Sequence, residues 1–374
     1  MRWSLTLGTV RGIKIRIHIT FLLIFTWAAY NWGTMLRRGW SWSGAVFGVI
    51  LICVVFLCIV LHELAHSLVA RRYGVRVSEI ELSPIGGVAK MERMPERPYQ
   101  EMTMALAGPA VNLVIAVLLG WLVLWLIRSG FIRSPGHLLY VMSRPSWQSF
   151  VLNLFFTNLL LALFNLLPAF PMDGGRVLRS ALAWSVGQHV ATRWATRVGR
   201  AAAVLLAIVG LLVGNWALVL IALVVFAGAQ QEQHLTELQA ILGDVQAGQA
   251  LIASCPSLAP DDTLATVVEL AMHGHPACFP VVVDGRLVGL LTQREITSAL
   301  EAYGPQARVG DLASMTLPTL SPRDSLARAQ QLMAASGLRA LPVSEDGRFL
   351  GMVTARQINE IFALISAQRR SRLQ

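Results

Sequence analysis

The sequence predicts a polytopic α-helical membrane domain of about six spans, with a β-hairpin near its functional site, followed by a cytoplasmic α/β domain pair. The 374 residues are 55% hydrophobic and only 14% charged, with a mean hydropathy of +0.58, which is a membrane composition with length left for a soluble domain. Residues 1–233 carry 20 Lys and Arg against 8 Asp and Glu, whereas residues 234–374 carry 11 against 13. The basic excess belongs to the membrane part and the tail has no basic stripe with aromatic residues, so no nucleic acid is expected as a partner.

The N-terminal part of the chain alternates basic and apolar residues, which predicts a short amphipathic strand at the membrane surface over residues 1–19. A cleaved signal peptide is the alternative for the first apolar stretch, but no small-x-small cleavage site follows it. The apolar stretches predict about six spans, at 20–32, 43–70, 102–127, 149–168 and, within 199–229, two short passes separated at Gly214-Asn215.

The distribution of Lys and Arg between these spans predicts the orientation. With the N-terminus inside, the inner segments 1–16, 71–99 and 174–200 hold 15 Lys and Arg, whereas the outer loops hold 5. We therefore expect a multi-pass protein of the cell (inner) membrane with a cytoplasmic N-terminus and a cytoplasmic tail.

The second apolar stretch contains His62, Glu63 and His66 after a run, 44–61, that has no charge. On a helix, the two histidines share one face a turn apart, with the glutamate beside them. Two imidazoles at that spacing can hold one Zn²⁺, and the carboxylate can take a proton from metal-bound water. The same pattern also arises by chance in soluble helices. Ionisable groups inside a bilayer-length apolar helix are costly, however, and their default interpretation is functional.

Residues 75–91 alternate polar and apolar side chains and then contain Pro84, Gly86 and Gly87, which predicts a β-hairpin. An ordinary cytoplasmic hairpin satisfies this pattern. The functional alternative is a strand edge beside the metal site that can pair with an extended peptide.

Polar residues also interrupt the third and fourth spans. Small residues at Gly108-Pro109 precede Asn112 and allow close helix packing. The segment from Asn165 to Asp173 contains two prolines and leads into a pair of glycines, which break the fourth span. Irregular backbone at membrane depth is tolerated where it lines a cavity or packs on protein, so Asp173 is a candidate third zinc ligand.

The tail is a duplicated module. Phe279-Pro280-Val281 matches Leu341-Pro342-Val343, and Asp284-Gly285-Arg286 matches Asp346-Gly347-Arg348, so the two copies lie 62 residues apart without a gap. Each copy predicts a helix, a strand, an Asp-Gly turn, a strand and a second helix.

Residues 8–230 resemble the site-2 protease family of intramembrane zinc metalloproteases. The motifs that carry the resemblance are His62-Glu63-x-x-His66, Asn165-x-x-Pro168-x-x-x-x-Asp173-Gly174, Gly108-Pro109 with Asn112, and Pro84-Ile85-Gly86-Gly87. The resemblance implies one zinc per chain, held by His62, His66 and Asp173, with Glu63 as the general base. It also implies that the oxyanion or the substrate backbone is contacted by residues among Asn112, Asn165, Gly86 and Gly87.

The tail resembles a pair of cystathionine-β-synthase (CBS) domains. The expected organisation is a membrane domain at 1–230, a linker at 231–248, CBS domains at 249–304 and 305–364, and a basic C-terminal tail at 365–374. CBS modules that bind adenine nucleotides often end in Thr-x-x-Asp. Here the position of the Asp, three residues after Thr292 and Thr354, is occupied by Glu295 and Gln357. An adenine nucleotide bound through Thr292, Glu295 and Thr354, or simple homodimerisation, are two alternatives for the tail.

The resemblance implies an endopeptidase of the HExxH type that cleaves transmembrane segments of membrane proteins, such as membrane-bound regulators or remnant signal peptides. Its partners would be these substrates and the lipid bilayer, with the CBS pair as a regulatory or dimerisation module. The alternative is a CBS-gated divalent-ion transporter or channel. In that case His62, His66 and Asp173 would form a transit site, and Glu63 would have no role as a base.

Overall fold

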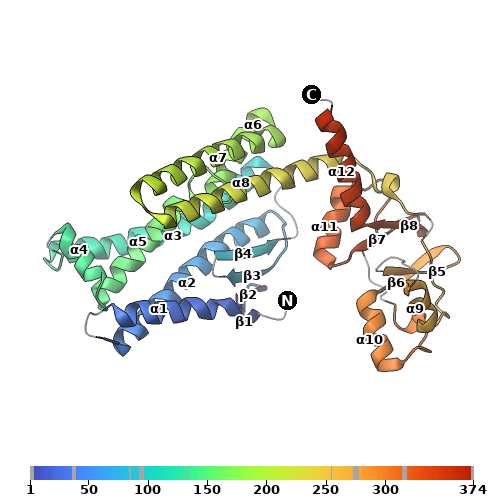
Figure 1. Cartoon of the computed structure of the whole chain (residues 1–374), viewed down its shortest axis with the longest axis horizontal. Coiled ribbons are helices and arrows are strands. Elements are labelled where there is room, and N and C mark those ends of the chain that lie inside the picture. Colours follow the sequence, from blue (N-terminus) through green and yellow to red (C-terminus); the bar gives the residue numbers. More distant parts are fainter. Residues whose placement is uncertain are drawn as a thin grey trace. The chain divides into compact units, whose positions relative to one another are not determined.

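The computed structural model describes residues 4–35, 39–83, 86–91, 97–132, 134–253, 255–272, 278–313 and 318–371. The chain divides into two compact units, Met1–Gln233 and His234–Gln374. The first unit consists of helices and a small sheet. In the second unit, shorter helices surround a sheet (Figure 1). The boundary falls within one helix, α8 (Trp216–Gly243), so most of the segment expected as a linker, 231–248, is helical.

Five helices in the described part of the chain are long and apolar enough to cross a membrane: α2 (Trp42–Arg72), α3 (Pro98–Arg128), α5 (Trp147–Asn165), α7 (Gln188–Val213) and α8. The expected break between the last two is present, because Gly214 adopts the left-handed conformation and the Asn215 side chain caps α8. The first expected span is α1 (Leu22–Thr34), whose 13 residues reach only about 20 Å against a hydrocarbon core of about 30 Å. Of the six stretches expected as spans, five correspond to long helices and the first corresponds to the short α1. The last two, expected as short passes within 199–229, are instead α7 and α8, which have 26 and 28 residues.

A four-stranded sheet in the first unit has the order β1 (Ser4–Val10), β2 (Ile13–His18), β3 (Val77–Ser83) and β4 (Gly86–Met91). The N-terminal segment is a hairpin rather than the single strand expected, because Arg11 and Gly12 take positive φ angles of 48° and 81° and form a two-residue turn. β3 and β4 pair antiparallel as the alternation predicted, although Pro84 and Ile85 lie outside the described residues. β4 is an edge strand of this sheet.

The sheet packs on the C-terminal half of α2 and the start of α3. Ile13, Ile80 and Leu82 are fully buried against Phe21 and Met104. On the other side of β3, Glu79 accepts hydrogen bonds from Lys90 (2.5 Å) and Arg16 (3.1 Å). The Lys90 hydrogen bond holds the pKa of Glu79 below its ordinary value, so these ion pairs join β2, β3 and β4 across the sheet.

A buried ion cluster joins three helices of the first unit. Arg179 of α6 (Asp173–Val186) forms ion pairs with Glu101 of α3 and Glu232 of α8. Arg179 is 6% and Glu101 2% exposed, and the guanidinium also lies over the ring of Phe170. Removing charged groups from water is tolerated only when they are paired, so α6 is tied firmly to α3 and α8.

The second unit has a single four-stranded sheet of order β5-β6-β8-β7 (Figure 1). Its first copy runs α9 (Leu264–Met272), β5 (Cys278–Val283), β6 (Arg286–Thr292), α10 (Gln293–Tyr303), and its second α11 (Leu326–Ser336), β7 (Ala340–Glu345), β8 (Arg348–Thr354), α12 (Ala355–Ser371). Both Asp-Gly turns have positive φ at both residues, and the two hairpins share a bulge at equivalent positions. The predicted order of elements is confirmed.

We expect Arg179→Met to lower the stability of the chain by about 3–5 kcal/mol, because methionine keeps the apolar stem but leaves two carboxylates without their buried cation. The measurement is the midpoint of thermal unfolding of the full chain in detergent. The control is Arg356→Met, which removes the exposed Arg356–Glu360 pair and should leave the midpoint unchanged. Equal effects of the two substitutions would contradict the importance of the buried cluster.

Candidate metal centre

The first unit encloses a cavity of about 600 Å³, called here the central cavity. Its walls come from α2, α3, β4, the end of α5, the start of α6 and Val224 of α8. The cavity contains every residue of the membrane part that the sequence singled out as a candidate for the site: His62, Glu63, His66, Gly86, Gly87, Asn112, Asn165 and Asp173.

Three ligand atoms converge in this cavity. Asp173 Oδ2 lies 3.1 Å from His66 Nε2 and 3.3 Å from His62 Nε2, and the two histidine nitrogens are 3.1 Å apart. Ligands bound to zinc at about 2.0–2.1 Å in a tetrahedron are separated by about 3.3 Å, which is the spacing found here. The donor set of two imidazoles and one carboxylate suits zinc and leaves a fourth position for water.

Two glycine positions allow this convergence. A Cβ at Gly108 of α3 would lie 2.6 Å from His62 Nε2 and would also overlap His66 Nε2, so only glycine lets α3 lie this close to the two ring nitrogens. A Cβ at Gly174 would overlap the carbonyl oxygens of Leu166 and Leu167 at the end of α5. The first turn of α6 can therefore sit directly on this backbone, which places Asp173 toward α2.

Both imidazoles are oriented by contacts from α3. His66 Nδ1 donates a hydrogen bond to the carbonyl of Met104 (2.7 Å), which leaves the lone pair of its Nε2 directed toward Asp173. A ligating histidine ordinarily has such an acceptor on its other nitrogen. His62 Nδ1 instead contacts Asn112 Nδ2 at 3.1 Å.

The orientation of the Asn112 carboxamide tests whether the site suits a metal. Asn112 is 1% exposed, and its Oδ1 is buried without a hydrogen-bond partner. Oxygen and nitrogen of a carboxamide exchange places by a half-turn, which would let Oδ1 accept a hydrogen bond from Nδ1–H of His62. In that arrangement Nδ1 of His62 is the donor, and the lone pair of His62 Nε2 is directed at the ligand cluster. The residues present therefore fit a zinc ion.

Glu63 lies beside the ligand cluster and is positioned by β4. A Cβ at Gly87 would be 2.5 Å from Glu63 Cγ and 3.3 Å from its Oε1, so the strand backbone lies against the glutamate side chain. Gly86, the first residue of β4, lines the same cavity, as does Asn165, the last residue of α5. Of the two candidate asparagines, Asn112 and Asn165, only Asn112 forms a side-chain contact with an imidazole, that of His62.

Arg176 is a cavity residue that the sequence reading missed. It lies on α6 three residues after Asp173, so the helical period places both side chains on the same face. The spacing of three residues from Asp173 could have identified Arg176 from the sequence. Its positive charge would act on any charged group bound at the ligand cluster.

The tail residues expected to bind a nucleotide are used in helix capping. Thr292 caps α10, and the backbone amide (2.8 Å) and the hydroxyl (2.7 Å) of Thr292 donate hydrogen bonds to Glu295 Oε2. Thr354 and Gln357 repeat the same contacts at the start of α12. Capping boxes of this kind stabilise a helix without any ligand, so the pattern by itself does not identify a nucleotide site.

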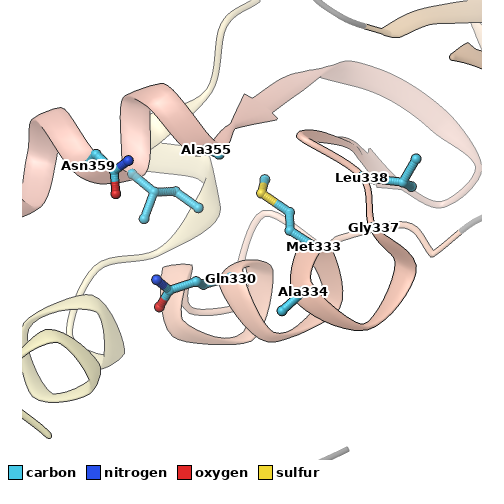
Figure 2. Close-up of a pocket in the computed structure, with 8 residues that line it drawn as sticks. Gln330, Met333, Ala334, Gly337, Leu338, Ala355 and Asn359 are labelled. Carbon is cyan, nitrogen blue, oxygen red and sulfur yellow. The ribbon is translucent and has the colours of Figure 1, made fainter. Parts of the chain in front are cut away.

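A pocket of about 290 Å³ lies between α11 and α12 of the second copy (Figure 2). The amides of Gln330 and Asn359 lie on one side of Met333, and Leu338 lies on the other (Figure 2). No charged side chain lines this pocket. Its lining residues are Gln330, Met333, Ala334, Gly337, Leu338, Ala355, Ile358 and Asn359.

The chain is similar to several known proteins. The family described as Peptidase family M50 matches residues 50–209, and the CBS domain family matches residues 248–302 and 309–363. The chain is 35% identical over 295 residues to a zinc metalloprotease of Methanocaldococcus jannaschii, with 78% of each chain covered. It is 31% identical over 382 residues to Rip3 of Mycobacterium tuberculosis, which also bears a zinc metalloprotease name, with 96% of this chain and 92% of Rip3 covered.

A solved structure is also similar. The site-2 protease from Methanocaldococcus jannaschii is 37% identical, with a TM-score of 0.43, and the match covers 62% of this chain and 95% of that one. The curated relatives place the chain among zinc metalloproteases. It belongs to the site-2 protease family, peptidase family M50, and carries two CBS domains.

We expect Asn112→Ala to weaken zinc binding by about 10–100-fold, because the His62 imidazole loses the group that orients it. Asn112→Asp should retain zinc, since a carboxylate is also an acceptor for Nδ1–H. The measurement is zinc per chain after dialysis against graded chelator. Asn158→Ala, which removes a buried asparagine of α5 bonded to the Leu154 carbonyl, is the matched control. Unchanged zinc affinity in Asn112→Ala would contradict this role.

Proposed function

We propose that the chain is an intramembrane zinc endopeptidase that hydrolyses peptide bonds in transmembrane segments of membrane proteins, such as membrane-bound regulators or remnant signal peptides. The observation that carries the proposal is the convergence of His62 Nε2, His66 Nε2 and Asp173 Oδ2 beside Glu63, in a cavity walled by long apolar helices. These three side chains would hold one zinc per chain, and the His-Glu-x-x-His pattern on α2 would supply two ligands and the base.

The chemistry divides between the metal and the glutamate. When bound, zinc would lower the pKa of the attacking water and stabilise negative charge on the peptide oxygen. Glu63 would accept the proton of that water and deliver it to the departing amine. Contact with Gly87 restricts the positions that the glutamate side chain can take, so the base would be held ready before substrate arrives.

The polar residues around the base would have distinct roles. Asn112 contacts His62 and would therefore position a ligand rather than bind the oxyanion. Asn165, together with Gly86 and Gly87, lines the cavity and would contact the oxyanion or the substrate backbone. Arg176 would add a positive charge near the peptide oxygen.

β4 would hold the substrate in an extended conformation. A transmembrane helix hides its amides in internal hydrogen bonds, so it must unwind locally before water can attack a carbonyl. β4 is an edge strand, and Gly86, Gly87, Val88, Ala89 and Met91 line the central cavity. An extended peptide paired with this edge would regain backbone hydrogen bonds next to Glu63.

Glu63→Gln is expected to retain about one zinc per chain and to lower the cleavage rate about 10²–10⁴-fold, because the amide cannot accept the proton. His62→Ala and Asp173→Ala should lose both zinc and cleavage. The measurement is zinc content together with cleavage of co-expressed single-span membrane proteins. A divalent-ion transporter gated by the CBS domains would instead show ion uptake that survives Glu63→Gln, and full cleavage by zinc-free protein would disprove the proposal.

The CBS pair would act as a cytoplasmic regulatory or dimerisation module of an inner-membrane protein. The ligand cluster and the base lie in the first unit, whereas the second unit has its own cores in both copies. Its capping residues are already paired, and the α11–α12 pocket is uncharged. These features favour association through helices over a nucleotide switch.

Deleting residues 249–374 should therefore leave zinc bound and change the cleavage rate or the substrate preference. The rate on a short unfolded peptide should change less than the rate on a transmembrane protein, because only the latter requires access through the bilayer. The control is Glu63→Gln in the same truncated chain. Complete loss of zinc on truncation would show that the tail is part of the catalytic fold.

A further inference from the structure

A further pocket of the first unit, of about 380 Å³, lies at the end of α2. It is lined by Arg11, Leu68, Val69, Arg71 and Arg72, and the three arginine side chains are exposed. Arg71 and Arg72 are the last residues of α2, and Arg11 comes from the turn between β1 and β2. Residues 60 positions apart in the chain thus bring three arginines to the lining of one pocket.

The turn is built to keep Arg11 at this place. Both turn residues have positive φ, a conformation in which asparagine or glycine is the usual choice at the Arg11 position. Its carbonyl accepts a hydrogen bond from Arg71 Nη1, which joins the turn to the end of α2. An arginine thus occupies a position for which the backbone alone favours another residue.

The positive charge of the pocket is not balanced within the described chain. No carboxylate among the described residues forms an ion pair with Arg11, Arg71 or Arg72, whereas Arg16 has one such partner and Arg179 has two. Three neighbouring guanidinium groups repel one another, and a bound anion would relieve that repulsion. A phosphate accepts hydrogen bonds from several guanidinium groups at once, in the geometry that arginine prefers.

The pocket is amphiphilic and lies where an apolar helix ends. Leu68 and Val69 form its apolar part on α2, a helix long and apolar enough to span a membrane, and the arginines follow within three residues. The adjoining strand also exposes apolar side chains, with Leu5 70%, Leu7 65% and Val10 39% exposed. Leucines left exposed beside arginines are typical of a surface that lies in the headgroup layer of a bilayer.

We propose that Arg11, Arg71 and Arg72 bind the phosphate of an anionic membrane phospholipid, with the start of its acyl chain against Leu68 and Val69. Free phosphate would satisfy the arginines but would leave the apolar part of the pocket unused. A lipid in this place joins the β1–β2 hairpin to the end of the helix that carries His62, Glu63 and His66. The site is separate from the proposed catalytic centre, so the two proposals can fail independently.

The test uses the full chain in detergent, titrated with phosphatidylglycerol, with phosphatidylcholine or with inorganic phosphate, and follows the midpoint of thermal unfolding. Phosphatidylglycerol should raise the midpoint more than phosphatidylcholine, and inorganic phosphate should not raise it at the same concentrations. Arg11→Asn and Arg72→Gln should each weaken the apparent affinity for phosphatidylglycerol about five-fold. Asparagine tolerates the left-handed turn, so Arg11→Asn removes the charge while keeping the fold.

The matched control is Arg76→Gln, which removes an exposed arginine near the same end of α2 but outside the pocket. It should bind phosphatidylglycerol as the unmodified chain does, and all variants should share the same midpoint without lipid. Three results would overturn the proposal: unchanged affinity in both pocket variants, an equal loss in Arg76→Gln, or an equal response to inorganic phosphate. The last result would assign the pocket to a soluble anion.

Discussion

The convergence of two imidazoles and one carboxylate inside a bundle of apolar helices is the constraint on which the first unit depends. Polar groups at membrane depth are tolerated only when their hydrogen-bonding groups are paired. Met104 and Asn112 on α3 contact the outer nitrogens of the histidines, and Gly108 makes room for both rings. One stretch of α3 therefore determines both the orientation and the spacing of the ligands from α2.

The third ligand places a different demand on the fold. Asp173 is the first residue of α6, and its position depends on where that helix begins and how it is anchored. Gly174 lets the helix start against the backbone at the end of α5, and Arg179 ties its middle to Glu101 and Glu232. The buried ion cluster is separate from the candidate metal centre, yet it holds the helix that carries Asp173, the third candidate ligand.

The two copies of the tail repeat the same turns, bulges and helix caps. Identical Asp-Gly turns, equivalent bulges and matching threonine caps occur at positions 62 residues apart, for example at Thr292 and Thr354. Each copy closes its own apolar core around its strands and helices. Glu295 and Gln357 take equivalent places in the caps of α10 and α12.

The sequence by itself determined the features that depend on local spacing. These are the pairing of His62 with His66, the break at Gly214, the hairpin from residue 75 to 91 and the duplicated tail, because helical and strand periods place nearby residues in known relations. Only the tertiary structure decided which distant groups meet. Asp173 contacts an imidazole 107 residues away, and Met104 accepts a hydrogen bond across 38 residues. The contact of Asn112 with His62 likewise follows from packing between elements, and no local pattern records such packing.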